Sequence, residues 1–141
     1  MKITTLAPLT LAATLCATVS SADVIRTVPN AEMNWAVTPE GVAFAPLIGD
    51  RFVESYMAMV KLPAGLISPA HVKSADMFGL IVSGTMTHTA LDNADDPVML
   101  NTGAFYHIPA GIPHVSSCVS DQECVSFLYQ DGQFDFLPVT N

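Results

Sequence analysis

Short runs of β-forming residues, separated by glycine- and proline-rich turns, restrict what this 141-residue chain can fold into. A first short strand is expected over 40–47. Five further apolar runs follow, at 52–61, 78–83, 86–90, 104–108 and 125–130. No stretch of helix length shows a helical period. The pattern therefore predicts a single all-β domain, a sandwich or barrel of short strands.

The first 22 residues have the composition of a secretory signal peptide. Lys2 supplies the positive start, residues 3–19 form an apolar run without acidic residues, and small residues at 20–22 precede a cleavage point. We expect export, to the periplasm. The predicted organisation is a signal peptide (1–22), an N-terminal arm with short strands (23–50) and a β-barrel domain (51–141).

The net charge of the mature chain argues against two classes of partner, nucleic acids and membranes. Loss of Lys2 with the leader leaves four basic residues against 13 acidic ones, a net charge of −9. Phosphate backbones and anionic lipid repel so acidic a chain. We therefore expect no nucleic-acid partner, and no membrane contact after the leader is cleaved; the expected partner is a small molecule.

Two cysteines remain after the leader. Cys118 and Cys124 flank a polar five-residue stretch between β-forming runs. A hairpin there brings the two sulfurs across adjacent strands, and an oxidising compartment favours their joining. We predict a structural disulfide between them.

Two histidines lie at fixed distances from glycines. Residues two apart on a strand share a face, so His71 and Lys73 should point to the same side. His114 begins a strand after a proline-glycine turn and is expected to join them in a pocket at the barrel mouth. His88 lies two residues after Met86 and is expected to be structural.

These two segments resemble the motifs of the cupin superfamily. The first motif, G-x5-H-x-H-x3-E-x6-G, and the second, G-x5-P-x-G-x2-H-x3-N, are matched at Gly65, His71, Gly84, Gly103, Pro109, Gly111 and His114. The ending SSCVSDQECVSFLYQDG is similar to the cupin half of ChrR-type anti-sigma factors. The resemblance implies a conical, antiparallel jelly-roll barrel, often a metal-dependent dioxygenase, an isomerase or a ligand-binding module.

The resemblance also implies a metal held by two histidines, a glutamate and the second-motif histidine. Here Lys73 and Met77 occupy two of those four positions. A protonated lysine has no lone pair for a cation, and a thioether is a poor ligand for iron or zinc, although copper(I) accepts it. The metal site that remains comprises His71 and His114, joined by Asp76 if a β-bulge turns that carboxylate inward.

Two functional hypotheses follow. In the first, His71, Lys73, Met77 and His114 line a pocket for a small polar or anionic molecule, and the metal site is degenerate. In the alternative, one divalent iron, zinc or copper ion supports a dioxygenase-like oxidoreductase acting on a small oxygenated compound. That alternative needs a third ligand from Asp76, Met77 or His88, so enzymatic activity stays open. Pairing through barrel edges predicts a homodimer.

Overall fold

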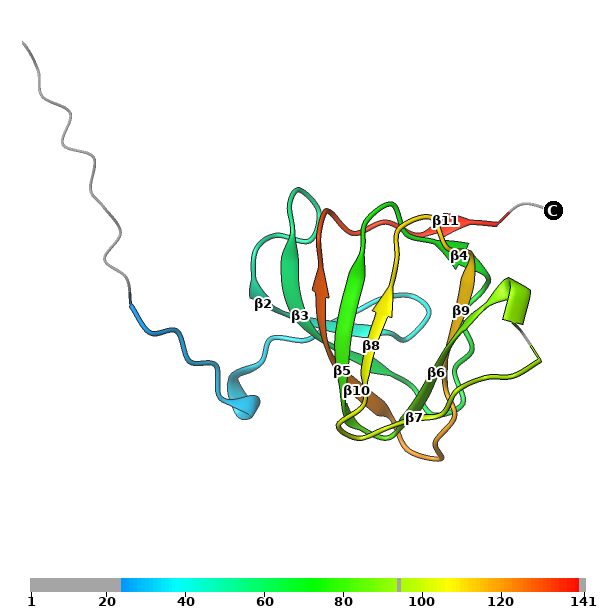
Figure 1. Ribbon diagram of the computed structural model, residues 1–141. Helices are drawn as coiled ribbons and strands as arrows, with labels where there is room; N and C mark the ends of the chain where they lie inside the picture. Colours follow the sequence, from blue (N-terminus) through cyan, green and yellow to red (C-terminus); the bar gives the residue numbers. More distant parts are fainter. Residues whose placement is uncertain (1–23, 94, 140–141) are drawn as a thin grey trace, which may run out of the picture.

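Two antiparallel β-sheets form the body of the molecule, seen in a computed structural model that describes residues 24–93 and 95–139 (Figure 1). The six-stranded sheet has the order β1 (Ala36–Val37), β2 (Ala43–Ile48), β3 (Tyr56–Leu62), β10 (Cys124–Gln130), β5 (Met77–Ser83) and β8 (Phe105–Ile108). The five-stranded sheet has the order β11 (Leu137–Pro138), β4 (His71–Val72), β9 (His114–Cys118), β6 (Thr85–Ala90) and β7 (Leu100–Asn101). Two short 3₁₀ turns, Asn30–Glu32 and Leu91–Asn93, complete the described elements.

All the pairings between these strands are antiparallel. The predicted all-β, antiparallel jelly roll is therefore confirmed. The predicted signal peptide lies outside the described residues. Within those residues, no helix is long and apolar enough to cross a membrane.

The core lies between the two sheets because their strands alternate in burial. Along β3 and β10 every second residue is buried, as the period of a strand requires. Ile81 of β5 and Met86 of β6 are almost completely enclosed, with 0% and 1% of their surface exposed. Inward-facing residues from both sheets thus share one apolar interior.

The segment predicted as an N-terminal arm contributes strands to the larger sheet. β2 pairs with β3 and buries Phe44 and Ala45. The strand expected from residue 52 begins only at Tyr56, because Asp50 organises a turn before it. The Asp50 carbonyl accepts hydrogen bonds from the N–H groups of Val53 and Glu54.

After β10 the chain crosses one end of the barrel to reach β11 beside β4, along the top of Figure 1. We call residues 131–138 the C-terminal strap. It is held at both ends: Gln130 Nε2 donates to the carbonyl of Gln133 at 2.7 Å, and β11 pairs with β4. In between, the Asp135 carboxylate accepts the Ser74 N–H at 3.1 Å. The strap therefore covers the end of the barrel where β4 lies.

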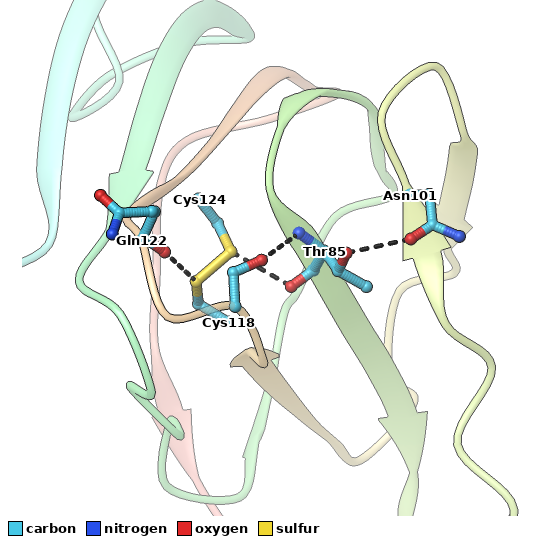
Figure 2. The surroundings of a disulfide bond; sticks show 6 residues. Thr85, Asn101, Cys118, Gln122 and Cys124 are labelled. Carbon is cyan, nitrogen blue, oxygen red and sulfur yellow. Dashed lines mark hydrogen bonds between the residues drawn. A yellow bond between two sulfur atoms is a disulfide. The ribbon is translucent and has the colours of Figure 1, made fainter.

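The predicted disulfide between Cys118 and Cys124 is present and joins β9 to β10 (Figure 2). These strands belong to different sheets, so the bond ties the two sheets together. A Cβ on Gly84 would lie 2.9 Å from the Cys124 sulfur, and the φ of Gly84 is +80°. Both facts require glycine at this position of the first motif.

Candidate ligand-binding site

Three histidines lie on neighbouring strands of the five-stranded sheet. His71 on β4 is directly opposite His114 on β9, and their ring centroids are 4.3 Å apart. His88 on β6 is opposite Ser116, two residues further along β9. His71 and His114 are buried, with 4% and 2% of their surface exposed. The expected convergence of His71 with His114 is thus what the structure shows.

The two buried rings of His71 and His114 are fixed in one orientation by backbone carbonyls. Nδ1 of His71 lies 2.9 Å from the carbonyl of Pro69, and Nδ1 of His114 lies 2.9 Å from that of Ile112. A carbonyl can only accept, so each Nδ1 carries a proton and donates it. Burial lowers the pKa of His71 to about 4 and also lowers the pKa of His114. Both rings are therefore neutral at pH 7, with a lone pair on Nε2.

His88 belongs to the same cluster, although the sequence was interpreted as giving it a structural role. Its Nδ1 lies 2.8 Å from Ser116 Oγ, and its ring centroid is 4.2 Å from that of Tyr106. Burial lowers the pKa of His88 to about 3, and His114 and His71 add to the effect. The sequence does indicate that His88 faces inward, because it lies two residues after Met86, which is buried in the core.

The Nε2 atoms of His88 and His114 lack hydrogen-bond partners. Both are buried, and no donor or acceptor among the described residues contacts them. Buried polar atoms in proteins are nearly always paired with protein groups or water. These two nitrogens therefore mark places where a bound molecule or ordered water would form hydrogen bonds.

Lys73 brings a positive charge to this cluster. Its side chain is 4% exposed, donates a hydrogen bond to the Asp135 carbonyl of the strap, and lies 4.1 Å from the ring centroid of Phe134. Burial lowers the pKa of Lys73 to about 8, with the Asp135 charge opposing and Arg51 adding to the shift. The ammonium is thus mainly charged at pH 7. No carboxylate within the described part of the chain forms an ion pair with it.

Asp76 lies at the surface, away from the buried histidine rings. The Asp76 carboxylate accepts hydrogen bonds from His107 Nε2 at 3.1 Å and from the Ala110 N–H at 2.8 Å, at the surface. The bulge that would turn Asp76 inward is not seen. Met77 is buried in the apolar core cluster. The structure therefore joins His71, Lys73 and His114, adds His88, and leaves Asp76 outside.

The donor set does not fit a cupin-type metal. Among residues 24–93 and 95–139, no group of three or more histidine, cysteine, aspartate or glutamate side chains is arranged to hold an ion. Catalytic metals usually take three protein ligands, and a lysine ammonium cannot serve as one. The expected metal ion stays a hypothesis, and no reaction step is derived through it.

Comparison with known proteins agrees with this architecture. Residues 58–128 match the Cupin domain family, which covers half of the chain. The chain belongs to the cupin family. No curated protein sequence matches it.

Solved cupin-like structures resemble the chain at low sequence identity. Polyketide cyclase RemF from Streptomyces resistomycificus superposes with a TM-score of 0.67 and 15% identity, over 84% of this chain and 87% of that one. KdgF from Halomonas sp. gives 0.61 and 17%, over 76% and 94%. An oxalate oxidase solved in complex with glycolate gives 0.54 and 18%, over 72% and 56%. These likenesses show the shared fold; the finer similarity to ChrR-type proteins stays a prediction.

Proposed function

We propose that this cupin binds a small anionic molecule bearing a hydroxyl group, such as a 2-hydroxy acid, beside Lys73, His71 and His114. The observation that carries the proposal is Lys73, a buried ammonium that forms no ion pair with any described side chain. Burying a charge is costly unless it is paired and hydrogen-bonded. A bound anion supplies that pairing.

Lys73 has the capacity for such a ligand. An ammonium has three N–H donors, and the carbonyl of Asp135 takes one of them. The ammonium also lies beside the rings of Phe134 and Phe136, whose centroids are 4.1 and 5.5 Å away. Aromatic faces attract a cation but leave its N–H donors unfilled. A carboxylate oxygen is the natural acceptor for them.

The neutral histidines are the reason for expecting a hydroxyl group in the ligand. With Nδ1 donating to backbone carbonyls, Nε2 of His71 and of His114 can only accept a hydrogen bond. A carboxylate has no proton to give, whereas a hydroxyl group has one. A hydroxy acid therefore satisfies Lys73 with its carboxylate and an imidazole with its hydroxyl. The oxalate oxidase that binds glycolate supports this class for the fold.

Calorimetric titration tests the proposal with matched pairs of probes. Lactate and glycolate should bind more tightly than propionate and acetate, which lack the hydroxyl group. The affinity should fall about tenfold from pH 7 to pH 9, because the pKa of Lys73 is about 8. Lys73→Met should abolish binding at both pH values. Equal affinity for propionate and lactate, or unchanged affinity in Lys73→Met, would contradict the proposal.

A second candidate, a metal-dependent oxidoreductase acting on a small oxygenated compound, is favoured by one observation. The Nδ1 atoms of His71 and His114 are held by backbone carbonyls, as in histidines that ligate a metal through Nε2. Elemental analysis decides between the two. Iron, zinc or copper at one ion per chain, lost in both His71→Ala and His114→Ala, would favour the oxidoreductase.

We also propose export and self-association. The signal-like composition of residues 1–22 supports cleavage before Asp23 and release into the periplasm. N-terminal sequencing of protein from the periplasmic fraction tests this, and an intact Met1 there would contradict it. Light scattering tests the homodimer.

A further inference from the structure

A cavity that none of the histidines lines lies at the edge of the barrel. Its volume is about 330 Å³, at the lower end of the range typical of ligand pockets, ~300–1,000 Å³. Apolar side chains of β1, β2 and β3 form much of its wall: Ala36, Phe44, Pro46, Ala58 and the ring of Tyr56. The turn before β3 adds Asp50, Arg51 and Phe52.

Arg51 is the cationic group of this cavity. Its guanidinium carbon lies 4.3 Å from the ring centroid of Phe44, 4.5 Å from that of Phe52 and 5.2 Å from that of Phe134. Its Nη1 atom is buried without a hydrogen-bond partner, and Arg51 forms no ion pair within the described residues. A guanidinium is always charged and presents a fork of donors suited to a carboxylate. Here that fork is enclosed by rings rather than by acceptors.

The neighbouring acidic group does not neutralise it. Asp50 is adjacent in the chain, but its Oδ1 accepts the N–H of Phe52 at 3.0 Å, and its own N–H donates to Glu54 Oε1 at 3.1 Å. The Asp50 side chain therefore stabilises the turn. Phe52, 63% exposed, covers Arg51 from the solvent side. An exposed ring loses little packing when it rotates away, so Phe52 can admit a ligand to the guanidinium.

We propose that this cavity is a second binding site, for a small apolar monocarboxylate such as a short fatty acid. The apolar wall would enclose the hydrocarbon part, and Arg51 would pair with the carboxylate. The residues that line this cavity include neither the histidines nor Lys73, although Phe134 of the strap lies beside both cations, with Lys73 4.1 Å from its ring centroid. The inference therefore stands without the proposed hydroxy-acid function.

Calorimetric titration with octanoate and 1-octanol tests the site, because the two probes differ in the charged head group. Octanoate should bind wild type about tenfold or more tightly than 1-octanol, the contribution of a charge-assisted pair. Arg51→Gln should remove that preference while leaving the affinity for 1-octanol unchanged. Ala36→Phe, which places a ring at the exposed cavity wall, should weaken both probes and serves if Arg51→Gln fails to fold.

His114→Gln is the matched control in the other site and should leave octanoate affinity unchanged. Equal binding of the two probes by wild type, or no octanoate binding, would overturn the proposal. So would full octanoate affinity in Arg51→Gln or Ala36→Phe, or its loss in His114→Gln. Lactate binding that survives Arg51→Gln while octanoate binding is lost would separate the two sites.

Discussion

Acidification from pH 7 to pH 5 should destabilise this protein, because folding lowers the pKa values of His71 and His88. Burial lowers the pKa of His71 from its ordinary value of 6.5 to about 4, and that of His88 to about 3. Between these values and 6.5 the unfolded chain binds more protons than the folded one. Stability therefore falls as pH falls. From pH 7 to pH 5 each histidine lowers the free energy of unfolding by about 2 kcal/mol, and together they lower it by about 4 kcal/mol.

Urea unfolding followed by circular dichroism at pH 7, 6 and 5 measures this slope. The expected wild-type loss is a large part of the 5–15 kcal/mol of a typical domain. His88→Gln should remove about 2 kcal/mol of the loss between pH 7 and pH 5, whatever it does to stability at pH 7. Val60→Ala, a core truncation without a titrating group, should lower stability equally at each pH. A wild-type free energy that is flat from pH 7 to pH 5 would refute the burial of neutral histidines.

Three further predictions concern the metal ligands, the core and the disulfide. Restoring the family's ligands with Lys73→His and Met77→Glu should give a protein that retains about one zinc ion per chain after dialysis, measured by elemental analysis. If the double variant retains no more zinc than wild type, these two positions are not what prevents metal binding. Gly79→Ala should destabilise by about 3 kcal/mol in urea unfolding, because its Cβ would overlap the Tyr106 ring. A loss below 1 kcal/mol would show that the ring moves freely. Reducing the disulfide should lower the free energy of unfolding by about 2 kcal/mol. Identical urea midpoints with and without reductant would contradict a structural role.

Strand positions were predictable where a long run carries its own signal. The predictions for β5 and β10 were each wrong by only one residue, at the start of the strand. They were close because the alternation of these strands and the glycines that follow them can be seen in the local sequence. The two-residue strands β4, β7 and β11 carry no such signal. β4 and β7 pair with the longer strands β9 and β6, and β11 pairs in turn with β4.

In the candidate site too, positions set by the local sequence could be predicted, and contacts with distant segments could not. Alternation along one strand places His71 with Lys73, and the turn after β8 places His114. The hydrogen-bond partner of Lys73 could not be predicted, because Asp135 is 62 residues away and the sequence of the strap does not indicate where that segment lies. Nothing in the sequence near Arg51 predicts that aromatic rings surround its guanidinium. Its surroundings arise from the approach of Phe44 and Phe134, which come from opposite ends of the described chain.

The change from the cupin motif at Lys73 keeps a positive charge in the site but removes a metal ligand. Lys73 stands where the family pattern has a metal-ligating histidine, so a positive charge is kept beside His71 and His114. A fixed ammonium attracts an anionic oxygen, but it does not polarise that oxygen as a metal ion would. The residues around it suit an ammonium: the strap supplies a carbonyl and two aromatic faces, and the imidazoles stay neutral. These contacts support recognition of an anion without the family's metal ligands, and binding is therefore the function that we propose for these side chains.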